Sequence, residues 1–280
     1  MYSIRVYFFN LKRIFKNYRG LEALNLFFIY TFYSARYNIL SRLLRVKITN
    51  ENIFGRKVSF FNYKDFIGLF EEIFIGREYY FETKSAAPRI VDCGSNIGMS
   101  VIYFKWIYPE AAITAIEADP DTFAMLKKNV EDNRFNGISL LNNAVHDRLA
   151  TVKFYYDPGT AGNLRMSMNA GRQNGKNFNT VKTLLLSSVI KTETDFVKMD
   201  IEGAEGAVIG ELVKKGSLKR ISKLAVEVHH NMEGSREILS GILAVFTKNG
   251  FKYQIYAPNN PPYFERKFQD VMLYAEKEAK

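Results

Sequence analysis

The stretch "IVDCGSNIGMS", residues 90–100, decides the fold of this 280-residue chain. A short apolar run ends at Asp92 and is followed by Gly94, Asn96 and Gly98. This spacing is typical of a buried strand that turns into a helix and leaves its backbone open to a small ligand. The stretch therefore predicts the first strand and the ligand-binding turn of an α/β fold.

Strand and helix patterns alternate from residue 89 onward, as in a mostly parallel sheet covered by helices. Short apolar runs predict five strands, at 89–92, 112–117, 139–144, 196–200 and 224–228. Helical periodicity occupies segments between or after them, at 98–107, 121–133, 204–214 and 235–249. Two more strands, at 253–256 and 271–275, are joined by a loop too short for a helical crossover, so we expect an antiparallel hairpin.

Composition divides the chain into three regions. Residues 1–50 are basic, aromatic and helical in pattern, residues 51–88 form a transition with a helix around "DFIGLFEEIF", and residues 89–280 hold the α/β domain. Residues 1–50 contain nine Lys and Arg against one acid, Glu22. Because the basic charge avoids the α/β domain, we expect no nucleic-acid partner. The single cysteine, Cys93, excludes an internal disulfide and indicates a reducing, cytoplasmic setting.

Residues 4–18 predict an amphipathic helix. Its apolar face would hold Ile4, Tyr7, Phe8, Leu11, Ile14, Phe15 and Tyr18, and its cationic face Arg5, Lys12, Arg13, Lys16 and Arg19. Two interpretations stay open: a cap helix packed on the domain, or a helix within residues 1–19 that lies on the inner face of an anionic membrane. The uncharged run at 23–35 has 13 residues, fewer than the about 20 that a spanning helix needs.

The segment at 157–183 shows almost no apolar periodicity and is rich in glycine and asparagine. A structureless segment of this length in a compact domain is typically functional or disordered. Both a flap over the site and a solvated insertion fit this composition.

The turn after the first strand distinguishes two nucleoside cofactors. Its glycine spacing departs from the G-x-G-x-x-G of dinucleotide sites. Asp92 suits the cationic S-adenosyl-L-methionine and would repel a pyrophosphate, and Asn96 adds a polar side chain where dinucleotide sites use bare backbone. Glu117, at the end of the next strand, can accept both ribose hydroxyls. Both cofactor classes carry such an acid, so the turn makes the choice, and we expect S-adenosyl-L-methionine with Ser95 in the same cradle. Asn143, after the third strand, would lie near the adenine amino group or serve as a turn residue.

Five segments occur in an order and spacing that resemble the FkbM family of S-adenosylmethionine-dependent methyltransferases: "EIFIGREYYF", "IVDCGSNIGMSVIYF", "AIEADP", "FVKMDIEGAE" and "LAVEVH". The resemblance covers about residues 65–271, and "KMDIEGAE" is its most specific element. It implies a seven-stranded, Rossmann-like class I methyltransferase fold, here with an N-terminal helical extension. It also implies methylation of hydroxyls on natural products and sugars.

Acids and a histidine follow the fourth and fifth predicted strands, where an acceptor would lie beside the cofactor. Asp200 and Glu202 are assigned to catalysis and Glu205 to substrate binding, because ionised carboxylates accept hydrogen bonds from hydroxyls. The same acids also suit helix capping or a hard cation. His229 is the expected base, since an ordinary pKa near 6.5 leaves imidazole mostly neutral at pH 7. Glu227 shares its face and would orient it or contact the substrate.

Two further features carry less weight. His230 would point away from the site. Asn260, Pro261, Pro262 and Tyr263 spell the motif of amino-methyltransferases, but they do not follow the fourth strand, and two prolines suit a hairpin loop.

The sequence thus predicts an O-methyltransferase that acts on a hydroxyl of a sugar, glycan or glycosylated natural product. Its partner would be a small-molecule or glycan acceptor, and no metal ligands are assigned. Two alternatives remain: an NAD-dependent Rossmann oxidoreductase, and a non-catalytic, membrane-associated adaptor that retains the fold.

Overall fold

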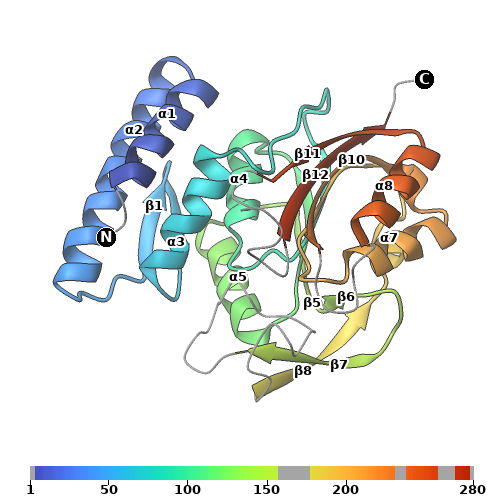
Figure 1. Cartoon of the computed structure of the whole chain (residues 1–280). Coiled ribbons are helices and arrows are strands. Elements are labelled where there is room, and N and C mark those ends of the chain that lie inside the picture. Colours follow the sequence, from blue (N-terminus) through green and yellow to red (C-terminus); the bar gives the residue numbers. More distant parts are fainter. Residues whose placement is uncertain (1–3, 157–176, 231–237, 258–268, 278–280) are drawn as a thin grey trace.

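The computed structural model describes residues 4–156, 177–230, 238–257 and 269–277. Its centre is a seven-stranded sheet in the order β11-β12-β10-β9-β3-β4-β5 (Figure 1). The strands are β3 (Arg89–Cys93), β4 (Ala112–Glu117), β5 (Ile138–Asn142), β9 (Thr194–Met199), β10 (Ile221–His230), β11 (Phe251–Tyr256) and β12 (Gln269–Lys277). This sheet confirms the predicted seven-stranded α/β fold.

Only β12 breaks the parallel arrangement of this sheet, because it pairs antiparallel with both β10 and β11. The predicted antiparallel hairpin at the end of the chain is therefore confirmed. The strand order reverses beside β3, which lies between β4 and β9. At such a reversal the crossovers leave in opposite directions and a crevice opens outside the carboxyl ends of the strands.

Helices cover both faces of the sheet. One face packs against α4 (Met99–Ile107) and α5 (Pro120–Asp132), and the other against α7 (Glu205–Lys214) and α8 (Ile238–Lys248). Along β3, Ile90 belongs to the first core and Val91 to the second, as the alternation of a strand requires. The short helices α6 (Leu186–Val189) and η4 (Leu218–Arg220) lie in connections.

The N-terminal elements join the core on the α4 face. They are α1 (Ile4–Asn17), α2 (Gly20–Ala35), the π-helical η1 (Arg36–Leu43), the hairpin of β1 (Asn50–Ile53) and β2 (Arg56–Ser59), α3 (Tyr63–Leu69) and the π-helical η2 (Phe70–Ile75). One continuous hydrophobic cluster runs from Ile14 and Tyr30 through Phe70 to Phe104. The predicted helix at 65–74 is α3 with η2, whereas the β1–β2 hairpin was not predicted. Among the described helices, none has the length and apolarity to cross a bilayer.

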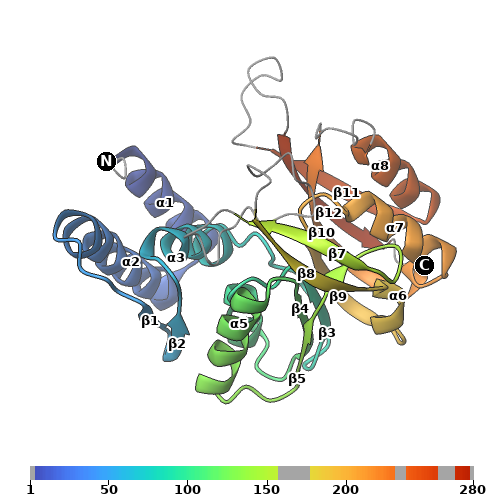
Figure 2. The same ribbon diagram turned by 90° about the horizontal axis from the view of Figure 1, so that it is seen from below.

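A second sheet flanks the first beside β5. It consists of β6 (Ala144–Val145), β8 (Asn177–Leu184) and β7 (Thr151–Tyr156), in that order, with β7 and β8 antiparallel (Figure 2). Two expectations need correction. The third strand ends at Asn142, and Ala144 belongs to this second sheet. The segment at 157–183 is not structureless throughout, because Val181 and Thr183 are buried while Lys182 between them is exposed, as in a half-buried strand. Residues 157–176 lie outside the described residues.

Candidate active site

A cavity of about 330 Å³ opens where the carboxyl ends of β3, β4, β9 and β10 meet. This volume falls in the range of about 300–1,000 Å³ that is usual for small-molecule sites. Nine of the twelve predicted site residues line it: Gly94, Ser95, Asn96, Glu117, Asn143, Asp200, Glu202, Glu227 and His229. The other three, Asp92, Gly98 and Glu205, do not line the cavity.

Packing within the protein explains the glycines of the turn after β3. Gly94 has φ +79°, and a Cβ atom there would lie 1.8 Å from the backbone oxygen of Asp200. Gly98 has φ +88°, and a Cβ atom would lie 2.7 Å from the side chain of Leu126. The Gly94 N–H donates to the Ile116 carbonyl at 2.9 Å. The glycines therefore let the turn pack closely against the residue after β9 and against α5.

Glu117 is a buried carboxylate fixed by backbone donors. Its Oε2 accepts from the Asn96 N–H and its Oε1 from the Asp119 N–H, each at 2.9 Å. Burial raises the pKa of Glu117 to about 7, although these two hydrogen bonds act to lower it. Asn143 lines the same cavity and donates from Nδ2 to the Lys182 carbonyl at 3.2 Å. Both residues therefore line one cavity, and their contact with a nucleoside stays a prediction.

Asp92 has a different partner from the one expected. Its side chain is fully buried, Oδ2 accepts from the Ser100 hydroxyl at 2.5 Å, and Oδ1 lies 3.5 Å from the ammonium of Lys198. The cation that Asp92 faces is therefore a residue of the protein, because the carboxylate lies beneath the turn and away from the cavity. The expected contact of Asp92 with a cofactor cation stays a prediction.

Lys198, which sequence reasoning missed, joins the two sides of the cavity. Its Nζ donates to the Gly94 carbonyl at 2.5 Å and lies 3.7 Å from Oδ2 of Asp200. Burial alone would lower the pKa of Lys198, but Asp92 and Asp200 raise it above its ordinary value, so the side chain is a cation. A lysine within a buried strand, two residues before an aspartate, was the available signal, since lysine is rarely buried without a partner.

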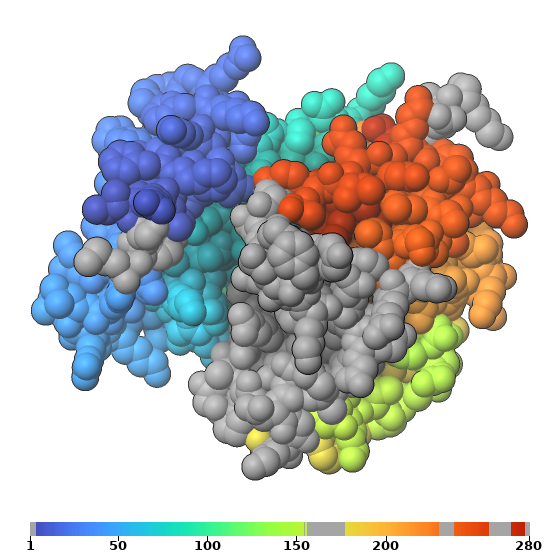
Figure 3. Space-filling view, viewed as in Figure 1, coloured from blue at the N-terminus to red at the C-terminus, as the bar shows by residue number. Residues whose placement is uncertain are grey.

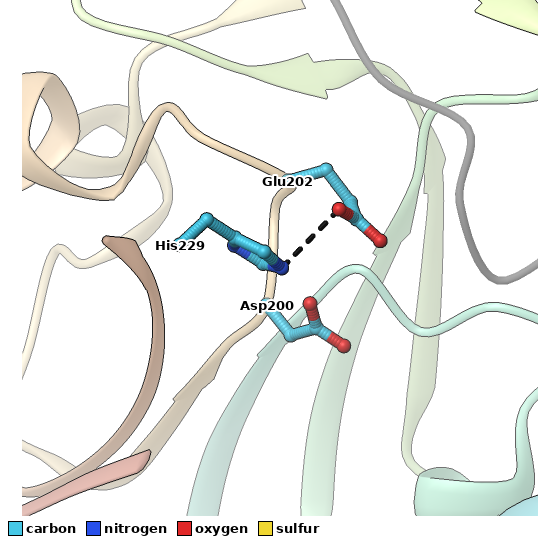
Figure 4. A group of neighbouring side chains, drawn as sticks. All are labelled: Asp200, Glu202 and His229. Carbon is cyan, nitrogen blue, oxygen red and sulfur yellow. Dashed lines mark ion pairs between the residues drawn. The ribbon is translucent and has the colours of Figure 1, made fainter. Parts of the chain in front are cut away.

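His229 is held between carboxylates at the exit of β10 (Figure 4). Its Nδ1 lies 2.9 Å from Oε1 of Glu205, and its Nε2 lies 3.2 Å from Oε2 of Glu202. Nε2 also lies 4.0 Å from Oδ1 of Asp270, the register partner of His229 on β12. Figure 4 shows the ring edge directed toward Glu202, with Asp200 close by.

The protonation state of His229 differs from the expectation. Burial would lower its pKa, but the hydrogen bond to Glu205 and the charges of Glu205, Asp200 and Glu227 outweigh it and raise the pKa to about 9. The imidazole is therefore protonated at pH 7, and the expectation of a mostly neutral ring is wrong. The reason is that both ring nitrogens face acids that lie apart in the sequence.

Of the two remaining acids, Glu205 departs from its assignment to substrate binding, and the assignment of Glu227 stays a prediction. Glu205 is fully buried and contacts His229 and the Gly203 N–H, so it orients the histidine from behind and does not reach the cavity. Glu227 lines the cavity, and burial, followed by the charge of Asp200, raises its pKa well above the ordinary value.

The turn after β9 places Glu202 at the cavity through an unusual backbone. Glu202 has φ +60° and the following Gly203 has φ +110°. A left-handed conformation at a non-glycine residue costs about 1–3 kcal/mol and persists where the surroundings impose it, often at functional sites. With this backbone conformation, the Glu202 side chain lines the cavity and forms the ion pair with His229.

Residues that were not predicted as site residues also line the cavity. Glu72 of η2 and Tyr79 line the cavity beside Asp270 of β12. Glu72 belongs to the transition region and Asp270 to the final hairpin, so neither sits at the end of a parallel strand, where site residues were sought. His230 and the residues at 260–263 were also considered, but the His230 side chain and that loop lie outside what the structure describes.

Two overlapping groups of side chains offer oxygen and nitrogen atoms within 4.8 Å of one another: Asp200, Glu202 and His229, and Glu227, His229 and Asp270. His229 belongs to both groups. A protonated imidazole has no lone pair for a cation, and a metal ligand must first lose its proton. A cation bound in either group would have to displace the imidazole proton.

The reversed strand order, the cavity at the reversal and the acid at the end of β4 define a class, the Rossmann-like nucleoside-binding α/β folds. Residues 92–253, more than half of the chain, match the family model of the methyltransferase FkbM domain. The chain therefore belongs to the FkbM family of S-adenosylmethionine-dependent methyltransferases.

Several known proteins are similar to the chain. Methyltransferase sdnD of Sordaria araneosa is 27% identical over 172 residues, which span 50% of this chain and 66% of that protein. Methyltransferase 1 of Beauveria bassiana is 27% identical over 173 residues, 61% of this chain and 65% of its own length. The chain thus spans just under two thirds of each relative. A methyltransferase FkbM structure from Methylobacillus flagellatus KT aligns at 16% identity and a TM-score of 0.46, over 74% of this chain and 53% of that one.

Proposed function

We propose that this chain transfers the methyl group of S-adenosylmethionine to a hydroxyl of a sugar, a glycan or a glycosylated natural product. The observation that carries the proposal is the position of Asp200, Glu202 and His229 in the same cavity as the glycine turn and Glu117. An acceptor in this cavity meets carboxylates that accept hydrogen bonds and a histidine that exchanges protons. Hydroxyl groups match such a surface.

The residues that follow β3 and β5, together with Glu117 at the end of β4, suit the cofactor. Glu117 presents a fixed carboxylate for the ribose hydroxyls, Asn143 a polar side chain for adenine, and the turn at Gly94 and Asn96 its backbone for the methionine tail. The bound cofactor supplies an electrophilic methyl group on a sulfonium. The chain then has to hold the acceptor oxygen in line with that methyl, and such orientation contributes up to about 7–11 kcal/mol.

The hydroxyl proton has to leave as the new oxygen–carbon bond forms. We assign its removal to Nε2 of His229, which the acceptor reaches by displacing Glu202 from its 3.2 Å contact. A pKa of about 9 means that the ring must first release its own proton, so turnover rises with pH up to that value. Asp200, which lines the cavity with its side chain partly exposed, is the second candidate base.

A labelled-methyl experiment tests this proposal. The full chain is first titrated with S-adenosylhomocysteine by calorimetry and then incubated with methyl-labelled S-adenosylmethionine and a panel of sugars, glycosides and amines. Binding followed by label on oxygen is the expected result. Label on nitrogen would overturn the hydroxyl assignment. Binding without transfer to any acceptor would favour the non-catalytic adaptor, and binding of NAD in place of S-adenosylhomocysteine would favour the oxidoreductase.

A further inference from the structure

Exposed apolar side chains concentrate in the N-terminal helices. Among the described residues, thirteen of the nineteen large apolar side chains that are exposed lie between positions 4 and 46. They are Ile4, Val6, Phe8, Phe9, Phe15, Leu21, Leu24, Phe28, Phe32, Ile39, Leu43, Leu44 and Val46. Val6 and Phe9 lie on the opposite side of α1 from Ile4, Phe8 and Phe15, and we call the other eleven the N-terminal apolar face. A soluble surface normally carries such side chains singly, and a concentration of them marks an interaction site.

The face is continuous across α1 and α2. Leu21, Leu24, Phe28 and Phe32 recur at helical spacing along α2, and Phe28 is 65% exposed. On α1, Phe15 is 53% exposed and its ring centroid lies 6.1 Å from that of Phe27, which in turn lies 5.2 Å from that of Phe28. Both helices form one edge of the molecule, away from the sheet, and Figure 3 shows the α1 side chains on that edge.

The opposite side of the helix pair is already occupied by the protein core. Leu26, Tyr30 and Tyr33 of α2 are buried, and the Tyr30 hydroxyl donates to Glu71 at 2.6 Å. Ile14 of α1 is also buried, and Asn17 donates to the Ile75 carbonyl at 2.8 Å. The helices are therefore fixed with their N-terminal apolar face outward. Of the amphipathic face predicted for α1, only part packs inward, because Ile4, Phe8 and Phe15 are exposed.

Cations surround this face. Between residues 4 and 50, the exposed cationic side chains are Arg5, Lys12, Lys16, Arg19, Arg42, Arg45 and Lys47, and the single acid is Glu22. Pairing two copies of the chain through this face would bring these like charges together. An anionic lipid surface neutralises them and accepts the apolar side chains into its interface. The charge pattern therefore selects lipid over a second copy.

We propose that α1, α2 and η1 dock the protein on an anionic lipid bilayer through the N-terminal apolar face. Phe8, Phe15, Leu24, Phe28 and Phe32 enter the headgroup–acyl boundary, and the cations of α1 contact lipid phosphates. The helices lie in the plane of the bilayer, since the 16 residues of α2 are too few to cross it.

Vesicle sedimentation tests the proposal with the full chain. Vesicles of phosphatidylcholine mixed with phosphatidylglycerol are expected to bind the protein, and vesicles of phosphatidylcholine alone to bind it far less. Lys12→Glu with Lys16→Glu should weaken binding about 25-fold or more, because each cation near an anionic surface contributes about fivefold. Leu24→Ser with Phe28→Ser should weaken binding to both vesicle types.

Matched controls separate docking from misfolding. Leu149→Ser with Ile255→Ser removes equally exposed apolar side chains elsewhere, and Lys214→Glu with Lys215→Glu reverses two exposed charges on α7 and at its end. Both controls should bind vesicles like the unchanged chain, and thermal unfolding should show that every variant is folded. Equal binding by the N-terminal and control variants would overturn the proposal. So would a dimer in analytical ultracentrifugation that Phe28→Ser disrupts, together with no vesicle binding.

Discussion

The cofactor side and the acceptor side of the cavity are held in different ways. On the cofactor side the main chain fixes the site: the Gly94 and Ser95 N–H groups donate to one carbonyl, and two further N–H groups hold Glu117. On the acceptor side, His229 is fixed by the charges of Glu205 and Glu202. The geometry of the first side should therefore depend mainly on the main chain, and that of the second on charged side chains. Lys198 contacts both sides, so its substitution tests whether the two sides depend on each other.

The largest effect is expected from His229→Ala. Loss of a positioned base lowers turnover about 10²–10⁴-fold, whereas affinity for S-adenosylhomocysteine should be nearly unchanged, because no described contact joins His229 to the cofactor turn. In the unchanged protein, turnover should rise about tenfold per pH unit between pH 6 and pH 8, since only the deprotonated fraction of a group with a pKa of about 9 acts as base.

Initial rates across pH 6–9 provide the measurement for His229, with calorimetry on the same samples. A flat pH profile, or turnover by His229→Ala at the rate of the unchanged chain, would move the base to Asp200 or Glu202.

Lys198→Met should damage both sides at once. The substitution keeps the length of the side chain but leaves the buried Asp92 and the partly exposed Asp200 without their cation. Removing one partner of a buried ion pair costs about 3–5 kcal/mol, so urea unfolding should shift by that amount, and both cofactor affinity and turnover should fall. The exposed Lys214→Met is the control. A Lys198→Met protein of unchanged stability would show that the two sides are independent.

A smaller effect is expected from Glu117→Gln. The amide keeps the shape but loses the charge that strengthens hydrogen bonds from the ribose by about 1.5–3 kcal/mol, or about 10- to 100-fold in affinity. Because the pKa of Glu117 is raised to about 7, the carboxylate form is lost as pH falls. Binding of S-adenosylhomocysteine should therefore weaken about tenfold from pH 8 to pH 6 in the unchanged chain and stay level in Glu117→Gln.

Calorimetry at the two pH values tests this, with the exposed Asp121→Asn as control. Equal affinity of Glu117→Gln and the unchanged chain would remove Glu117 from the cofactor site.

Features formed by residues near each other in sequence could be predicted, and contacts between side chains of different strands and helices could not. The turn from Asp92 to Gly98, the acid at Glu117 and the final hairpin follow from local spacing, and the structure places them accordingly. The ion pair of Asp92 with Lys198 and the contact of His229 with Glu205 join different elements, so their chemistry was misjudged from local patterns. The second sheet was missed because polar residues dominate β8, where only Val181, Thr183 and Leu184 are buried.

The contact between Gly94 and the Asp200 carbonyl constrains how such an enzyme can diversify. Because a single Cβ atom at Gly94 would lie 1.8 Å from that oxygen, the turn after β9 cannot shift toward β3 without displacing the cofactor loop. A change of acceptor is therefore expected to keep the path of this turn and to alter the cavity elsewhere. The wall contributed by η2 lies outside the strand ends that hold Gly94 and Glu117, so substitutions there are expected to cost methyl-donor binding least.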